Sequence, residues 1–287
     1  MSQFLTAQYH GISPYTAGEQ PHDRTYIKLN ANETSCPPSS AVLQALRSCR
    51  MEQLGRYADP YSNELRTAIA THYHLSTTQV LATNGADEAL TFIFQTFFLD
   101  QHICFPDITY NYYETLATAF HIDAQKIPLQ EDFRLDVAAL CRTDRHIVIA
   151  NPNAPTGLLL SPPEIERITA SKPNRLVVVD EAYIDFGNTS CLPLLQHYSN
   201  LIIVHTMSKS RNLAGAHIGC CLASSELIRD LAIVKGVLNP FNISDINQAI
   251  GTAAMKDTLY LQQCTAAIQE TRSAMTQALR ELDFTVL

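Results

Sequence analysis

Several hallmarks of other protein classes are missing from this sequence of 287 residues. Its 20 basic residues are outnumbered by 28 acidic ones and form no local cluster, which argues against a nucleic-acid surface. Apolar runs such as residues 201–204 are far too short to cross a bilayer. Residues 1–10 lack the basic and apolar regions of a signal peptide. We therefore expect a soluble protein located in the cytoplasm, with no membrane or nucleic-acid partner.

The cysteine spacing indicates neither a disulfide framework nor a metal site. None of the eight cysteines stands in a CxxC pattern, and Cys220 and Cys221 are adjacent, a poor geometry for a disulfide framework. A reducing compartment and no bound metal are the expectations. Hydrophobic residues make up 46% of the chain and charged residues 17%, an ordinary globular balance that allows one large domain or two modest ones.

From about residue 38 the pattern alternates between helical and strand-like segments. Near-continuous apolar strands that alternate with helices are typical of an α/β fold with a mainly parallel sheet covered on both faces. Functional side chains should then lie at the carboxyl ends of the strands. Helices are expected over residues 39–50, with Ser39 as N-cap, 63–73 and 86–98, and strands over 79–83, 102–105, 146–150, 176–179 and 201–204.

Beyond residue 240 the pattern changes to long helices, which we expect over residues 244–256 and 258–282. The last residues, 281–287, have the pattern of a beginning strand.

Two apolar strands lead into polar side chains of opposite charge. Residues 176–179 run directly into Asp180, and residues 201–204 are soon followed by Ser208 and Lys209. Lysine normally belongs on solvated faces, so a lysine delivered into a small-residue turn by a buried strand is unusual. Pyridoxal phosphate needs an amine that holds it as a Schiff base and a carboxylate that keeps its ring nitrogen protonated. The pair therefore predicts a pyridoxal-phosphate enzyme.

Together with residues 151–157, Asn-Pro-Asn-Ala-Pro-Thr-Gly, these motifs resemble those of aminotransferases of pyridoxal-phosphate fold type I, and most of all the histidinol-phosphate aminotransferases. The resemblance covers nearly the whole chain, in order. It implies an N-terminal arm with the start of a small domain over residues 1–37, a large cofactor-binding domain over 38–240 and an incomplete C-terminal small domain over 241–287. Family members continue for several dozen residues, so we expect a truncated chain.

The resemblance assigns chemical roles to three side chains. Lys209 would bind the cofactor and act as general base, Asp180 would pair with the pyridinium nitrogen, and Tyr183 would hydrogen-bond to the ring O3′. The structural alternatives are a surface lysine at a strand end, an aspartate that caps a following helix, and a tyrosine packed in a core.

Further cofactor contacts also follow from the resemblance. Tyr110 would stack on the cofactor ring. The backbone amides of Ala86 and Asp87, at a helix N-terminus, would bind the phosphate together with the hydroxyl of Ser208. Arg211 is a possible cation for the phosphate, with a solvated arginine as the alternative.

Tyr57, within residues 55–60, matches the family tyrosine that reaches the phosphate of the neighbouring subunit. The resemblance therefore implies a homodimer.

Two positions depart from the family pattern. The arginine that the family commonly carries eight residues after its lysine, as a phosphate ligand, is His217 here. Histidine can donate to a phosphate but is only partly charged near neutral pH. The family asparagine that contacts O3′ falls on Ala154, and Asn153 lies one residue away, where it could substitute. We expect a reduced affinity for the cofactor.

Substrate contacts are expected from two segments near the N-terminus. Residues 11–15 resemble the family segment that covers the bound substrate, which makes Tyr15 a substrate-binding residue. Residues 30–33 match a family signature that contains Asn32, and their structural alternative is a turn with side-chain to backbone hydrogen bonds.

The resemblance implies transfer of the amino group of L-histidinol phosphate to 2-oxoglutarate, giving imidazole acetol phosphate and L-glutamate in histidine biosynthesis. Threonine-phosphate decarboxylase and aromatic aminotransferase share the fold and many motifs, and both stay open. A different class is also open, in which a chain without a complete small domain binds cofactor or dimerises without turnover.

Overall fold

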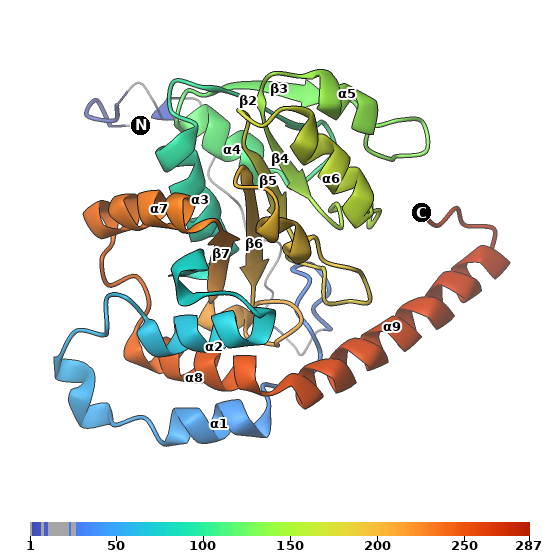
Figure 1. Ribbon diagram of the computed structural model, residues 1–287. Helices are drawn as coiled ribbons and strands as arrows, with labels where there is room; N and C mark the ends of the chain where they lie inside the picture. Colours follow the sequence, from blue (N-terminus) through green and yellow to red (C-terminus); the bar gives the residue numbers. More distant parts are fainter. Residues whose placement is uncertain (1, 7–8, 11–22, 24–26) are drawn as a thin grey trace.

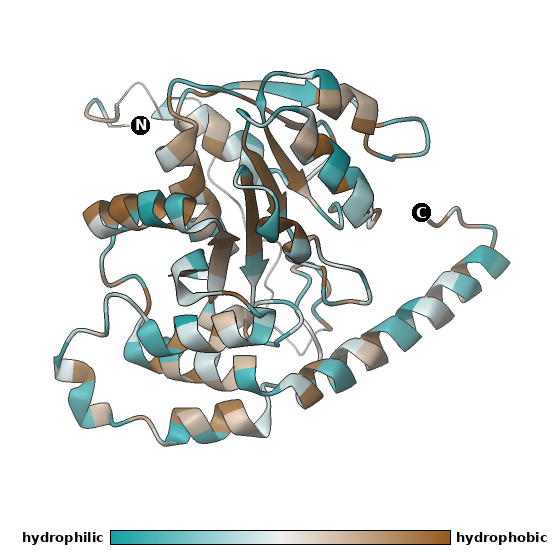
Figure 2. Cartoon of the chain, in the orientation of Figure 1, coloured by the Kyte–Doolittle hydropathy of each residue, from teal (hydrophilic) through white to brown (hydrophobic). Residues whose placement is uncertain are grey.

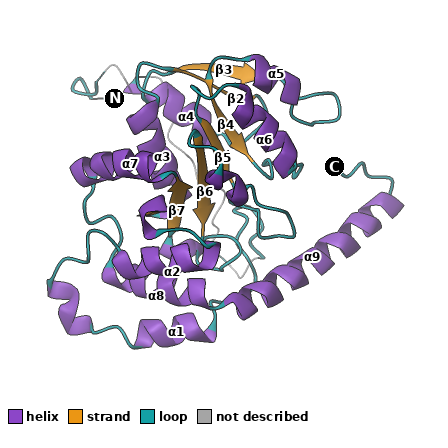
Figure 3. Cartoon of the chain, in the orientation of Figure 1, coloured by secondary structure: helices purple, strands orange, loops and turns teal. Residues whose placement is uncertain are grey.

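A central sheet with helices on both faces forms the fold (Figures 1 and 3). The computed structural model describes residues 2–6, 9–10, 23 and 27–287. The strands are β1 (Val80–Thr83), β2 (His102–Pro106), β3 (Asp123–Ile127), β4 (His146–Ala150), β5 (Val177–Asp180), β6 (Leu201–Thr206) and β7 (Gly219–Ala223). Their order is β1-β7-β6-β5-β4-β2-β3. β7 runs antiparallel to β1 and β6, and the other neighbours are parallel, which confirms the mainly parallel α/β sheet.

The described part of the chain forms nine α-helices. They are α1 (Ser40–Arg47), α2 (Asn63–Tyr73), α3 (Gly85–Phe97), α4 (Tyr112–Ala119), α5 (Val137–Arg142), α6 (Pro162–Ser171), α7 (Ser225–Leu238), α8 (Asp245–Lys256) and α9 (Thr258–Glu281). Short 3-10 helices span Met51–Gly55, Thr77–Gln79, Leu192–Gln196 and Ala214–Ala216.

Each face of the sheet has its own hydrophobic core. One core contains side chains from α3, α4 and α7, and the other contains side chains from α1, α2, α5, α6 and α8. Every residue of β5 and β7 is buried, and the central strands are strongly hydrophobic in Figure 2. Burial of both faces explains why the strands of the sheet centre are apolar runs rather than alternating patterns.

Local sequence explains most of the helix boundaries. The Ser39 hydroxyl accepts a hydrogen bond from the amide of Val42, which confirms it as the N-cap of α1. That helix ends at Arg47, three residues before the predicted end. The predicted helix over 63–73 agrees with α2 at both ends. The observed α3 begins at Gly85, whose φ of +78° lets the chain turn sharply from β1 into the helix.

Two strands were not predicted, for different reasons. β7 is short and rich in small residues and cysteine, so its sequence carries little strand signal. β3 lies at the edge of the sheet, where three of its five residues are exposed and polar.

The C-terminal helices behave differently from each other. α8 packs against α1 and α2, whereas α9 extends away from the rest of the molecule (Figure 1). The strand predicted within residues 281–287 is wrong, because α9 continues to Glu281 and residues 284–287 have no regular secondary structure. A strand needs a hydrogen-bonding neighbour, and no strand of the described residues pairs with this segment.

No helix formed by the residues that the structure describes is long and apolar enough to cross a membrane. In the same residues no cluster of three or more His, Cys, Asp or Glu side chains could hold a metal ion.

Candidate functional site

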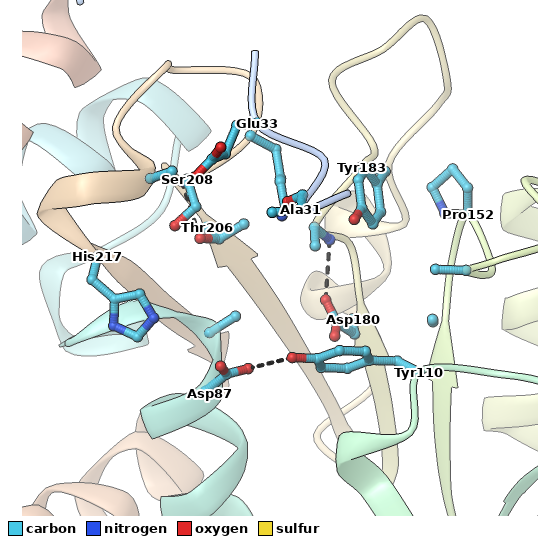
Figure 4. Close-up of a pocket in the computed structure, with 16 residues that line it drawn as sticks. Ala31, Glu33, Asp87, Tyr110, Pro152, Asp180, Tyr183, Thr206, Ser208 and His217 are labelled. Atoms are coloured by element: carbon cyan, nitrogen blue, oxygen red, sulfur yellow. Dashed lines mark hydrogen bonds between the residues drawn. The ribbon is translucent and has the colours of Figure 1, made fainter. Parts of the chain in front are cut away.

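A cavity of about 220 Å³ opens at the carboxyl ends of β4, β5 and β6 (Figure 4). This is the edge of the sheet where functional side chains were expected. In Figure 4, Asp87 and His217 lie at one end of the cavity and Tyr183 and Pro152 at the other. Its walls are formed by Ala31, Glu33, Ala86, Asp87, Tyr110, Ala150, Pro152, Ala154, Asp180, Ala182, Tyr183, Thr206, Ser208, Lys209, Ala214 and His217.

Asp180 is the buried acid of this cavity. As the last residue of β5 it is 5% exposed, and it accepts hydrogen bonds from the hydroxyl of Tyr113 (3.0 Å) and the amide of Ala182 (3.1 Å). Burial raises the pKa of Asp180 to about 6, although both hydrogen bonds favour the charged form. A buried carboxylate of this kind is stabilised by a cationic group placed in the cavity beside it.

Lys209 supplies an amine on the same cavity. Its side chain is half-buried, and Nζ donates to the carbonyl of Ala31 at 3.3 Å. Nζ also lies 5.6 Å from the ring centroid of Tyr183. The structure therefore brings Lys209, Asp180 and Tyr183 together around one cavity, as the sequence predicted, from the ends of neighbouring strands.

Asn32 contacts the site through Tyr183. Its side-chain amide donates to the Tyr183 hydroxyl at 2.9 Å, and its φ of +51° turns the backbone so that Ala31 and Glu33 face the cavity. Asn32 itself is not in the cavity wall, so a substrate contact for it stays a prediction. Tyr15, the other predicted substrate residue, lies outside the described residues.

Tyr110 forms one wall and is fixed by Asp87. The Tyr110 hydroxyl donates to Asp87 Oδ1 at 3.0 Å, and the ring meets Tyr113 edge-on with centroids 5.7 Å apart. Burial, reinforced by the Asp87 carboxylate, raises the pKa of Tyr110, so its hydroxyl stays protonated and acts as a donor. A ring held in this way offers a flat apolar face to a ligand.

The other end of the cavity is suited to an anion. α3 starts here, and Ala86 and Asp87 in its first turn line the cavity with Ser208. Unpaired amides and the helix dipole attract negative charge at such a position. The close approach of β7 to this turn requires Gly219, because a Cβ there would lie 2.6 Å from the carbonyl carbon of Gly85.

His217 lies against the same turn. A Cβ on Gly85 would come within 2.6 Å of the imidazole ring, so ring and helix N-terminus are in close contact. The side chain is exposed and in the cavity wall. The structure thus brings Ala86, Asp87, Ser208 and His217 together, as predicted for a phosphate site.

The prediction that Asn153 contacts the cofactor is wrong. Its buried side chain donates to the carbonyl of Ile108 (2.9 Å) and the hydroxyl of Thr156 (3.1 Å), and accepts from Thr109 (2.7 Å). These bonds hold the loop after β2 against the loop after β4. Ala154, not Asn153, lies in the cavity wall.

The prediction that Arg211 binds phosphate is also wrong. The chain turns at Asn212, whose φ is +58°, and the buried Arg211 guanidinium reaches the carbonyl of Ala254 (2.6 Å) and Nε2 of His72 (2.9 Å) instead of the cavity. Burial and the neighbouring guanidinium lower the pKa of His72 to about 4, so its neutral imidazole can accept this hydrogen bond. Arg211 joins the end of α8 to α2.

Sequence reasoning missed several contributors to the site. Tyr113 is fully buried and bonds to Asp180 from α4, and Thr206 lines the cavity while its hydroxyl accepts from the amide of Ser208 at 3.2 Å. The position of Thr206 two residues before Ser208 was a usable signal. Tyr113 gave none, since a tyrosine at the start of a helix is common.

The residues present fit pyridoxal 5′-phosphate. A primary amine, a carboxylate whose pKa is raised by burial, an aromatic wall and a helix N-terminus suited to an anion surround one cavity. Fold and cavity together define a pyridoxal-phosphate enzyme of fold type I.

Comparison with known proteins gives the family. The sequence pattern of aminotransferase class I and II matches residues 24–287. The chain is 38% identical to a histidinol-phosphate aminotransferase of Clostridium beijerinckii, over all of this chain and 80% of that protein. It is 44% identical to the Lactococcus lactis subsp. cremoris enzyme of the same name, over 96% of this chain and 78% of the relative. The chain belongs to the aminotransferase class I and II family, and it is a transaminase.

A solved structure supports the same conclusion. The histidinol-phosphate aminotransferase of Sinorhizobium meliloti, in complex with pyridoxal-5′-phosphate, superposes with a TM-score of 0.77 at 26% identity. The match covers 85% of this chain and 68% of that one.

His217→Arg is expected to bind the cofactor more tightly than the native chain. A guanidinium at this position would place a permanent positive charge beside the N-terminus of α3, and a charge-assisted hydrogen bond contributes about 1.5–3 kcal/mol against roughly 1 for a neutral one. The cofactor dissociation constant should therefore fall by up to about tenfold.

Absorbance titration with pyridoxal phosphate measures the cofactor dissociation constants of the native chain and of His217→Arg. The matched control is His121→Arg, since His121 is also exposed with a left-handed backbone (φ +55°) but does not line the cavity. Equal affinities for the native chain and His217→Arg would show that Ala86, Asp87 and Ser208 hold the phosphate without this side chain.

Proposed function

We propose that this transaminase transfers the amino group of L-histidinol phosphate to 2-oxoglutarate, giving imidazole acetol phosphate and L-glutamate in histidine biosynthesis. The observation that carries the proposal is the meeting of Lys209, Asp180 and the α3 N-terminus around one cavity. Relatives named histidinol-phosphate aminotransferase, at 38% and 44% identity, support the choice of substrate.

Each residue has a task in this proposal. When bound, pyridoxal phosphate supplies an electron sink for the substrate carbon that loses its proton. The Asp180 carboxylate provides the countercharge for the pyridinium nitrogen, and Lys209 Nζ holds the cofactor before substrate arrives and then moves the proton from the substrate Cα. Tyr183 donates its hydroxyl to the ring oxygen, with Asn32 fixing the orientation of that hydroxyl at 2.9 Å.

The opposite end of the cavity would hold the phosphate of the cofactor. Amides of Ala86 and Asp87, the hydroxyl of Ser208 and the imidazole of His217 would supply the donors. Tyr110, which is held in the wall by its hydroxyl bond to Asp87, would offer its face to the cofactor ring.

A panel of amino donors tests the proposal. Purified chain loaded with pyridoxal phosphate and 2-oxoglutarate should form glutamate faster with histidinol phosphate than with phenylalanine, tyrosine or histidinol. Carbon dioxide release from threonine phosphate would instead assign a decarboxylase. Cofactor binding without turnover on any donor would contradict the transaminase activity of this chain.

We further propose a homodimer in which Tyr57 reaches the neighbouring site. Tyr57 is 81% exposed and stacks on Phe241, with ring centroids 4.4 Å apart. Val237 and Leu238, at the end of α7, are 77% and 52% exposed. Lys235 Nζ donates to the carbonyls of Pro60 and Pro240, and so joins the segment that follows Tyr57 to the segment that precedes Phe241. An exposed apolar group of this kind is typical of a protein contact, and most soluble homo-oligomers are closed symmetric dimers.

Subunit mixing tests the dimer. Neither Tyr57→Ala nor Lys209→Ala should be fully active alone. If Tyr57 acts across the interface, each mixed dimer contains one site with both native residues, and random mixing should restore about a quarter of native activity. If Tyr57 acts within its own chain, no mixed dimer has an intact site and mixing restores nothing.

The domain boundaries and the cellular location are two further proposals. We propose the division into residues 1–37, 38–240 and 241–287, with α8 and α9 in the C-terminal small domain. A cytoplasmic location is supported by the eight cysteines, all of them free.

A further inference from the structure

A buried polar pair lies on the sheet face opposite the cavity. Glu181 follows Asp180 directly, and His205 precedes Thr206 in β6. Side chains alternate across a sheet, so Asp180 and Thr206 face the cavity while Glu181 and His205 face the other core. The Glu181 side chain is fully buried and that of His205 is 6% exposed, with Oε2 and Nε2 2.9 Å apart. Neither side chain is in the cavity wall.

Glu181 closes the loop that carries Tyr183. Its Oε1 accepts from the amide of Cys191 at 2.8 Å, and its Oε2 accepts from the Ser190 hydroxyl at 2.5 Å. The two ends of loop 182–191 are thereby fixed to each other. Because Tyr183 lies within this loop, its position depends on the closure.

The same loop is joined to the segment of Lys209. Asp185, in the loop, accepts from the hydroxyl of Ser210 at 2.5 Å, and Ser210 is the residue after Lys209. On the other side, His205 Nδ1 lies 2.9 Å from the hydroxyl of Tyr73, in α2. The Glu181–His205 bond therefore joins the end of β5, the end of β6, the Tyr183 loop and α2.

We propose that Glu181 and His205 are positioning residues whose buried hydrogen bond sets the spacing of Asp180, Tyr183 and Lys209. The proposal rests on the roles given above to those three residues. Removing the bond leaves a fully buried carboxylate without one of its donors, and the ends of β5 and β6 can then shift relative to each other. A misplacement of about 1 Å at a reacting group costs on the order of a hundredfold in rate.

Three variants separate the parts of this arrangement. His205→Leu removes both ring nitrogens at similar volume. His205→Gln places an amide nitrogen near the position of Nε2 and keeps the donor to Glu181, so it serves as the conservative rescue. Tyr73→Phe removes only the hydroxyl on the far side of His205.

Arg175→Met is the matched control. Arg175 is 2% exposed and donates to the carbonyls of Leu140, Thr143 and Ile168 near the other end of β5. Its loss should destabilise the fold without disturbing the strand ends that face the cavity.

Two readouts besides turnover are measured on protein loaded with pyridoxal phosphate: the cofactor dissociation constant and the pH midpoint of the cofactor absorption band. His205→Leu should loosen the cofactor about tenfold and move the midpoint by about one pH unit, because the charges around the cofactor amine are displaced. His205→Gln should recover most of both effects, and Arg175→Met should show neither at equal loss of stability.

Native affinity and midpoint in His205→Leu would overturn the proposal, as would an equal shift in the Arg175→Met control. If His205→Leu does not fold, His205→Gln is compared with Glu181→Gln instead. The proposal would then be overturned if the cofactor dissociation constant and the pH midpoint of His205→Gln are no closer to the native values than those of Glu181→Gln. A native chain that binds no cofactor would instead overturn the proposed function, and with it the role of the pair.

Discussion

Replacement of Lys209 by alanine is expected to lower transamination by at least about 10⁴-fold, since it removes both the nucleophile and the proton carrier. Among the residues that the structure describes, Lys209 is the only lysine in the cavity wall. Its Nζ makes a single 3.3 Å hydrogen bond, to the Ala31 carbonyl, in the described part of the chain. The free energy of unfolding should therefore change little while activity disappears.

Borohydride reduction of the loaded protein, followed by peptide mapping, measures this directly. The cofactor should be fixed on the peptide that contains Lys209 and absent from the Lys209→Ala protein. Lys126→Ala is the control, because Lys126 is exposed and pairs with Glu114 on the surface. Fixation on another lysine, such as the buried Lys235, would falsify the assignment.

The candidate site was predictable because its residues follow buried strands. Apolar runs before Asp180 and Lys209 identify β5 and β6, and functional side chains are expected at the carboxyl ends of such strands. The structure shows that β5 and β6 are parallel neighbours, which brings the carboxylate and the amine to one cavity. The helix N-terminus at Ala86 was visible for a similar reason, since acidic residues in the first turn identify a helix start.

The errors concern the direction of side chains in irregular segments. Arg211 stands two residues after Lys209, but its guanidinium reaches α2 and α8 instead of the cavity. Asn153 is adjacent to Ala154 and yet bonds to the loop after β2. Backbone dihedrals of loops depend on distant contacts, and a single sequence does not specify them. Tyr113 was missed because its bond to Asp180 joins residues far apart in the chain.

Asp180→Asn is expected to separate stability from function. In the protein without cofactor, burial raises the pKa of Asp180 from 3.8 to about 6. The folded state then binds this proton more tightly than the unfolded state, so stability falls as pH rises through this window and the cost is fully present above it. A shift of about two units corresponds to roughly 3 kcal/mol. Asparagine carries no charge, so the variant should gain up to about 3 kcal/mol at pH 7.5 and almost nothing at pH 3.

The native hydrogen bonds allow this gain. An asparagine at this position can accept from the Ala182 amide through Oδ1, and its amide nitrogen can donate to the Tyr113 hydroxyl, which keeps both contacts of Asp180. The cofactor-bound protein should respond in the opposite direction. Loss of one partner of a buried ion pair costs about 3–5 kcal/mol, which corresponds to a fall in turnover of about 10²–10⁴-fold.

Urea unfolding of the cofactor-free proteins at pH 3, 5 and 7.5 tests the expected gain in stability. Transamination rates of the cofactor-loaded proteins test the expected loss of turnover. Asp136→Asn is the control, because Asp136 caps α5 outside the cavity by accepting from the amide of Ala139, and asparagine caps helices equally well. Near-native transamination by Asp180→Asn would contradict the proposal that Asp180 is the countercharge of the pyridinium nitrogen. A variant less stable than the native chain at pH 7.5 would show that the Asp180 carboxylate is stabilised in the empty site. Greater stability with lost turnover would mean that the fold accepts a destabilising buried charge at Asp180 because the cofactor needs it there.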